Sequence, residues 1–169
     1  MPENWDVIYE RESPVLYGYL LKKADPESAQ DILQETFVKV MQAAERIEIQ
    51  NIRSYLFKTA RSLLIRQYKY KEKIELEEDQ SNLVEQKSYQ DNLEFKEMLD
   101  IIHEELADLK DQEKEVFQLR WEVGLSTTEI SRVIDKSDRQ VRRVLEKIAR
   151  KLSNSLKSKG YDLSEDLNA

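Results

Sequence analysis

The sequence predicts an all-α protein of two small helical domains, a helical bundle and a helix-turn-helix, joined by a flexible acidic linker. Its 169 residues include only 3 Gly and 3 Pro, the two residues that helix interiors disfavour most. Apolar residues recur at helical spacing in two blocks, and a charged stretch with few apolar residues separates these blocks. We expect domains at residues 1–73 and 95–157, the linker at 74–94 and an acidic tail at 158–169.

The composition argues against several classes of protein. No run approaches the roughly 18 apolar residues that a membrane span needs, and the N-terminus lacks the pattern of a signal peptide. The chain has no Cys and a single His, so neither a disulfide framework nor a Cys/His metal site is expected. The sequence also lacks a phosphate-binding loop and a recognisable nucleophile–base set. We therefore expect a cytoplasmic protein that does not insert into membranes, is not an enzyme and needs no cofactor or metal.

The second helix of the first domain has a clear start signal. Asp25 can cap it, Pro26 suits its first position and Glu27 places an acid in its first turn. One wide apolar face follows, with acid and amide groups on the other face. An acid-amide-acid strip beside Phe37 suits a basic helical hairpin, although a merely solvated face is the alternative interpretation.

A third helix is expected from about Ile52, and it begins a basic segment. The net charge of the chain is −7, yet residues 53–73 contain seven basic residues and one acidic residue. Tyrosines interleave with these cations. Rings can stack on unpaired bases while cations hold phosphates, so this helix is a candidate surface for single-stranded DNA. A solvated basic face is again the alternative.

The second domain contains the most informative stretch of the sequence. A helix capped by Asp111 is expected to stop at Gly124, and two capping boxes follow, at residues 126–129 and 137–140. Two capped helices so close together predict a helix-turn-helix. Residues 136–159 contain nine basic and two acidic residues, opposite an apolar face. A helix of this kind suits the major groove of DNA.

These motifs resemble those of the sigma factors, and in particular of the small two-domain group called extracytoplasmic-function sigma factors. The resemblance covers residues from about Trp5 to Leu156. Members consist of region 2, which melts the promoter, and region 4, a helix-turn-helix. The resemblance implies an RNA polymerase subunit for promoter-specific transcription initiation. Its implied partners are core polymerase, through the β′ coiled coil and the β flap, and promoter DNA as duplex and melted strand. It also allows an anti-sigma protein or another recruiting factor.

The resemblance also implies roles for particular residues. Residues 29–37 look like the region 2.2 motif, which docks on polymerase, and the implied contacts are Asp31, Gln34, Glu35 and Phe37. Residues 53–64 resemble regions 2.3 and 2.4, and the implied contacts to the minus-ten element are Tyr55, Lys58, Arg61, Ser62, Arg66 and Lys69. Residues 124–130 and 141–152 resemble region 4.2, and the implied contacts to the minus-thirty-five element are Ser137, Arg139, Arg142, Arg143, Glu146, Lys147 and Arg150.

The sequence departs from the family pattern at four positions. Ser62 stands where most members have Asn, Arg66 where Asp or Asn is usual, and Val144 and Ala149 replace common basic residues. These departures suggest the hypothesis that promoter targeting depends on a partner. The alternative function is a helix-turn-helix regulator that acts without core polymerase. That alternative explains residues 111–157 and leaves the first 73 without a role.

Overall fold

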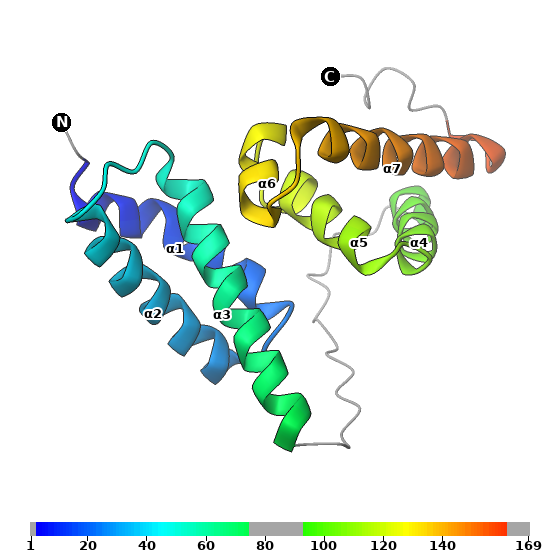
Figure 1. Cartoon of the computed structure of the whole chain (residues 1–169). Helices are drawn as coiled ribbons and strands as arrows, with labels where there is room; N and C mark the ends of the chain where they lie inside the picture. Colours follow the sequence, from blue (N-terminus) through cyan, green and yellow to red (C-terminus); the bar gives the residue numbers. More distant parts are fainter. Residues whose placement is uncertain (1–2, 75–92, 162–169) are drawn as a thin grey trace. The chain divides into compact units, whose positions relative to one another are not determined.

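The computed structural model describes residues 3–74 and 93–161, and within these ranges all regular structure is helical (Figure 1). The all-α prediction is therefore confirmed for the described residues. Most of the predicted linker and tail, residues 75–92 and 162–169, lies outside them. None of the described helices is both long enough and apolar enough to cross a membrane.

Three helices form the N-terminal part of the chain: α1 (Trp5–Leu21), α2 (Pro26–Ala44) and α3 (Ile52–Ile74). The start of α2 is as predicted, because the Asp25 carboxylate accepts a hydrogen bond of 3.1 Å from the Ser28 N–H. Asn51 caps α3 in the same way, accepting from the Ser54 N–H at 2.9 Å. Satisfying these otherwise unpaired N–H groups stabilises a helix by about 1 kcal/mol each.

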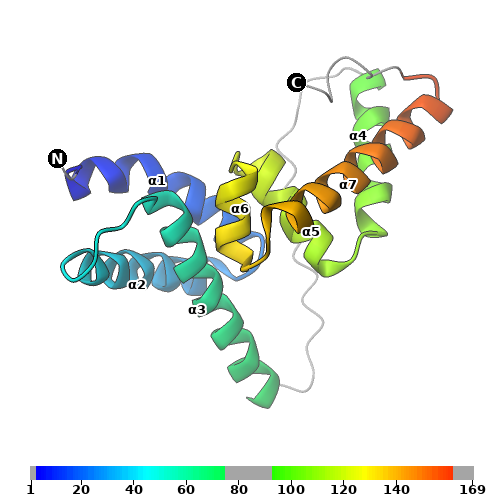
Figure 2. The same ribbon diagram turned by 45° about the horizontal axis from the view of Figure 1, so that its top comes forward.

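The core between these helices comes from one apolar face of each. Helix α2 packs against both α1 and α3 (Figure 2). The Tyr19 and Phe57 rings meet edge to face with their centroids 5.4 Å apart. The largest fully buried aliphatic side chains of this core are Ile8, Leu16, Leu20, Val40 and Leu56. Burial of each large side chain contributes roughly 1.5–3 kcal/mol, which fixes the opposite face of each helix toward solvent.

The C-terminal part contains α4 (Leu93–Ala107), α5 (Asp111–Phe117), a five-residue π-helix η1 (Gln118–Glu122) and α7 (Asp138–Ser158). Its core includes Leu109, Ile148 and Leu152. The prediction of Asp111 as a cap is wrong by one position: Lys110 is the N-cap, and Asp111 is the first helical residue. An acid in the first turn still favours the helix through its dipole.

A short helix, α6 (Thr127–Ile134), precedes α7 and follows Gly124, which has φ +88° as a glycine after a helix end often does. Three residues separate α6 from α7, and the first of them, Asp135, has φ +56°. The predicted capping box at the start of α7 is confirmed. The Ser137 hydroxyl accepts from the Gln140 N–H at 3.1 Å, and the Gln140 side chain accepts from the Ser137 N–H at 3.0 Å.

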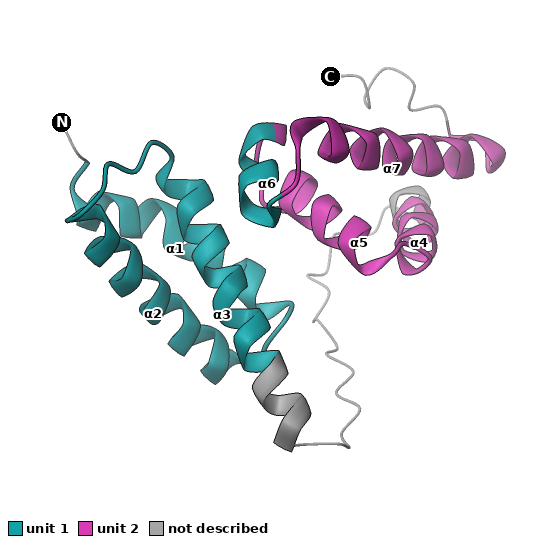
Figure 3. Cartoon of the chain, in the orientation of Figure 1, with its two compact units in different colours: residues 1–84, 128–135 teal, residues 85–127, 136–169 magenta. Residues whose placement is uncertain are grey.

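The chain divides into two compact units (Figure 3). Unit 1 comprises residues 1–84 and 128–135, and unit 2 comprises residues 85–127 and 136–169. Helix α6 thus groups with unit 1, although the chain places it between α5 and α7 of unit 2. The domains expected from the sequence, 1–73 and 95–157, are instead each one continuous stretch of the chain.

Candidate nucleic-acid and polymerase interfaces

Helix α3 places most of the predicted minus-ten residues on one face. Lys58, Ser62 and Arg66 are four residues apart and exposed, and Tyr55 lies half-buried one turn earlier. Arg61 is half-buried on the flank of this face. The Lys69 side chain lies outside the described part of the structure. The α3 face therefore combines an aromatic ring with cations, as a surface for unpaired DNA requires.

Besides the Ser54 hydroxyl at its start, two hydroxyl groups of α3 are already engaged within the protein. The Ser62 hydroxyl donates to the Lys58 carbonyl at 3.0 Å, so it is left with acceptor capacity only. The Tyr68 hydroxyl donates to the Lys23 carbonyl, which ties α3 to the residues that follow α1. The ring of Tyr68 is half exposed and held in place by this bond.

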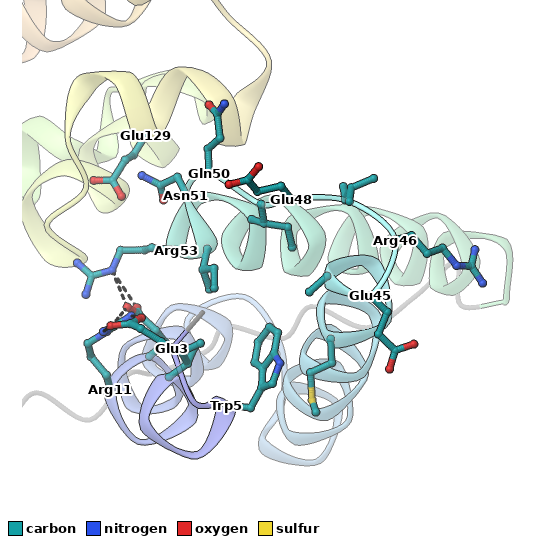
Figure 4. A pocket seen from close by; sticks show the side chains of 17 residues that line it. Glu3, Trp5, Arg11, Glu45, Arg46, Glu48, Gln50, Asn51, Arg53 and Glu129 are labelled. Atoms are coloured by element: carbon teal, nitrogen blue, oxygen red, sulfur yellow. Dashed lines mark hydrogen bonds and ion pairs between the residues drawn. The ribbon is translucent and has the colours of Figure 1, made fainter. Parts of the chain in front are cut away.

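A buried ion pair anchors the first turn of α3 to α1 (Figure 4). The Glu12 side chain is 1% exposed, and its oxygens lie 3.1 and 2.9 Å from Nε of Arg53. Nε of Arg11 donates to the same carboxylate at 2.9 Å. A carboxylate removed from water needs such partners, because burying it unpaired costs several kcal/mol.

The second carboxylate of this cluster lies at the surface. Both terminal nitrogens of Arg11 donate to Glu3, each at 2.9 Å. These hydrogen bonds lower the pKa of Glu3 below its usual value and raise the pKa of Arg11. The sequence analysis missed the whole cluster. Its signal was available: Glu12 interrupts the apolar series Ile8, Leu16 and Leu20 at helical spacing.

The predicted polymerase strip is exposed on α2, with one correction. Asp31, Gln34 and Glu35 face solvent, and Glu35 lies 3.7 Å from Lys39 one turn later. Phe37 does not belong to this exposed strip. It is 5% exposed, and its ring packs against Tyr9 at a centroid distance of 4.8 Å.

The apolar surface next to the strip comes from two other residues of α2. Val38 is 53% exposed and Met41 is 40% exposed. They follow Gln34 by four and seven residues, so they continue its face of the helix. Exposed apolar side chains beside acids form a mixed surface of the kind that interfaces use.

Helix α7 presents most of the predicted minus-thirty-five residues. Arg139, Arg142, Glu146 and Arg150 are spaced by three or four residues and exposed, and Arg143 is exposed beside them. The apolar residues Val141, Ile148 and Leu152 are buried on the other side. Ser137 differs from its implied role, since its side chain caps α7 and its hydroxyl is engaged there.

Lys147 is also exposed on α7, and it takes part in an ion pair within unit 2. Its ammonium lies 3.4 and 3.3 Å from the two oxygens of Glu113, a buried residue of α5. Farther along α7, Lys151 lies 3.8 Å from Glu105 of α4, and the Ser155 hydroxyl donates to the same carboxylate at 2.6 Å. Lys147 and Lys151 thus connect α7 to the neighbouring helices of unit 2.

The described residues contain no candidate metal-binding site. Residues 3–74 and 93–161 contain no group of three or more His, Cys, Asp or Glu side chains placed to hold an ion.

Each of the two helical units carries a basic helix with exposed cations, an arrangement typical of nucleic-acid-binding proteins. The family described as Sigma-70 region 2 matches residues 8–74, and Sigma-70 region 4 matches residues 106–154. The two matches together span more than half of the chain in the family's order. The chain belongs to the sigma-70 family, whose members are the promoter-recognition subunits of bacterial RNA polymerase.

Two solved structures share this fold. The sigma factor RpoE in complex with the anti-sigma factor NepR from Bartonella quintana has a TM-score of 0.63 at 16% identity, covering 90% of this chain and 96% of RpoE. CnrH, solved in complex with the cytosolic domain of CnrY, has a TM-score of 0.60 at 18% identity, covering 91% of this chain and 88% of CnrH. A search of curated proteins gave no match.

Proposed function

We propose that this sigma factor belongs to the extracytoplasmic-function group and binds promoter DNA at two sites. Helix α3 holds the melted minus-ten strand, and α7 reads the minus-thirty-five duplex. The observation that carries this proposal is the match to regions 2 and 4, which contain the exposed basic helices α3 and α7, respectively. Both sites on one chain give a two-point attachment, whose combined affinity exceeds that of either site.

The cations of α7 are assigned different roles according to their position along the helix and to whether an acid is paired with them. Arg142 and Arg143 are exposed near the N-terminal end of the helix, where recognition helices meet base edges. Arg150 lies two turns farther on and suits a backbone phosphate. Lys147 is paired with Glu113, so we assign it mainly to holding α7 in place.

Polymerase binding is assigned to α2. Asp31, Gln34 and Glu35 supply negative charge and hydrogen-bond acceptors toward a basic helical hairpin of core polymerase. Val38 and Met41 supply the apolar area that charges alone lack. This combination suits a partner surface that is both basic and apolar.

An anti-sigma protein is a proposed partner. RpoE, which shares the fold, was solved bound to the anti-sigma factor NepR. A protein that covers α2 and α3 of this chain would block polymerase and DNA together. The four departures from the family pattern also leave room for a partner that delivers the factor to promoters.

Reconstituted transcription tests the proposal. Purified core polymerase with this chain is expected to start transcripts at defined positions on a library of genomic fragments, whereas core polymerase alone is not. Glu35→Ala should weaken capture of core polymerase, with Glu10→Ala, at an exposed glutamate of α1 outside the strip, as the matched control. A chain that shifts duplex DNA at nanomolar concentration and ignores polymerase would contradict the proposal and favour a regulator acting alone.

A further inference from the structure

We propose that Arg53 reads an unpaired guanine of the promoter and that Glu12 is the residue that positions it. Glu12 holds Nε of Arg53, and the two terminal amino groups of Arg53 then donate to O6 and N7 of the base. The inference rests on the proposed function, because it requires a melted strand at unit 1. Arg53 begins the motif 53–64 but is not among the contacts implied above, so the inference adds this contact, the base that it reads and the role of Glu12.

The two arginines that share Glu12 are bonded differently. Arg11 donates Nε to Glu12 and both terminal nitrogens to Glu3, so its whole guanidinium group is engaged. Arg53 uses only Nε, on the two oxygens of Glu12. Within the described residues, its terminal nitrogens have no hydrogen-bond acceptor. Arg53 therefore keeps an open pair of donors with fixed geometry.

The location of Arg53 suits contact with a base. It is the second residue of α3 and directly follows the segment 45–51 between α2 and α3. Its side chain is 34% exposed and lines an open pocket together with Trp5 and Asn51 (Figure 4). The aromatic ring offers apolar surface to a base, while polar groups select its edge.

The charges around Arg53 favour a base over a phosphate. Arg11 and Arg53 are balanced by Glu3 and Glu12, so these four groups carry no net charge. The segment 45–51 adds two acids and one arginine. Phosphate binding gains from uncompensated positive charge, which is missing here. Arg53 still presents its two terminal amino groups as donors, and these match O6 and N7, the two adjacent acceptors of guanine.

Glu12 acts through Arg53 and is a positioning residue. Its carboxylate is fixed because the residue is buried on the apolar face of α1. Two contacts to one Nε hold the plane of the guanidinium group. An arginine without such a support samples many rotamers and loses that freedom on binding.

The test uses holoenzyme and fork-junction DNA that carries guanine or 7-deazaguanine at each position of the unpaired minus-ten strand in turn. 7-Deazaguanine lacks the N7 acceptor and keeps the shape of the base. The unmodified protein is expected to bind the analogue roughly tenfold more weakly at one position. Arg53→Lys keeps the charge, but its ammonium group should take the place of Nε beside Glu12 and leave no donors for the base, so this variant should bind both DNAs equally.

Arg46→Lys is the matched control. Arg46 is an exposed arginine that lines the same pocket, but Glu12 bonds to Arg11 and Arg53 and not to Arg46, so its variant should keep the tenfold ratio. This ratio is the affinity for guanine DNA divided by the affinity for 7-deazaguanine DNA. Both are measured on the same protein preparation, so a fraction of inactive protein does not change the ratio. Glu12→Gln should reduce the ratio in part, and adding it to Arg53→Lys should cause no further change. If Glu12→Gln does not fold, the comparison of Arg53→Lys with the unmodified protein still tests the inference.

Three results would overturn the inference. The unmodified holoenzyme could bind promoter DNA yet respond to 7-deazaguanine at no position, or Arg53→Lys could keep the tenfold ratio. Alternatively, Arg53→Gln could weaken all sequences alike and lower the salt dependence, which indicates a phosphate contact. In each case the proposed function survives. A holoenzyme that binds no promoter DNA removes the proposed function and this inference together.

Discussion

The ammonium group of Lys147 on α7 lies 3.3 Å from the buried carboxylate of Glu113 on α5. The pair joins the helix proposed to read duplex DNA to the helix that supports it. Glu113 is buried, whereas the Lys147 side chain remains 60% exposed. The pair is therefore more important to the carboxylate, which has lost its water, than to the ammonium group.

Lys147→Met should destabilise the protein more than it weakens DNA binding. It leaves Glu113 buried without its cation, which costs about 1–3 kcal/mol. Urea unfolding would measure this loss. Arg150→Met, an exposed change on the same helix, should stay within about 0.5 kcal/mol of the unmodified protein. Equal stability of the two variants would refute the structural role of Lys147.

Arg142→Ala should relax promoter selection. If its guanidinium group reads a base, affinity falls roughly tenfold and preference is lost at one base pair of the minus-thirty-five site. Arg150→Ala should instead weaken all sequences alike and reduce the salt slope by about one. Holoenzyme binding to a set of single-base promoter variants, at several salt concentrations, distinguishes the two. If Arg142→Ala weakened binding to all promoter variants equally, Arg142 would contact a phosphate and not a base.

Val38 and Phe37 are neighbours in sequence with opposite expected effects. Val38→Ala with Met41→Ala should weaken capture of core polymerase several-fold and change stability by less than about 1 kcal/mol, because both side chains are substantially exposed. Phe37→Ala should lower stability by about 3–5 kcal/mol through a cavity. Affinity measurements and unfolding curves on the same variants test both halves. Normal polymerase binding by the double variant would remove Val38 and Met41 from the interface.

Asp135 offers a test of the turn before α7. Its φ of +56° lies in the left-handed region, which costs a residue with a Cβ atom about 1 kcal/mol. Asp135→Gly should therefore be more stable than Asp135→Ala by about that amount. Thermal unfolding of the two variants gives the comparison directly. An alanine variant as stable as the glycine variant would show that the turn adopts another conformation.

The starts of helices were the part of the fold that local sequence predicted best. The Asp25 cap and the Ser137 capping box depend on side chains within three residues of each other. Such contacts need no knowledge of the rest of the fold. The π-helix at η1 had no comparable local signal, and the single helix expected from 111 to 124 is interrupted there.

The site was harder to predict, because it depends on orientation and on distant pairs. Phe37 and Val38 differ by about 100° around a helix, and proximity to the acidic strip favoured Phe37. Burial of one ring against Tyr9 settles which side is inside. Glu12 and Arg53 are 41 residues apart, so no local pattern could pair them.

Helix α7 has 21 residues and is therefore about 31 Å long. Only its first turns carry the exposed arginines proposed for base contacts, while its later turns are bonded to α4 and α5 through Lys151 and Lys147. The proposed base contacts and the ion pairs to neighbouring helices thus lie on different turns of one helix. Exchange of Arg142 or Arg143, both exposed, is expected to change promoter preference and to leave the ion pairs of Lys147 and Lys151 intact.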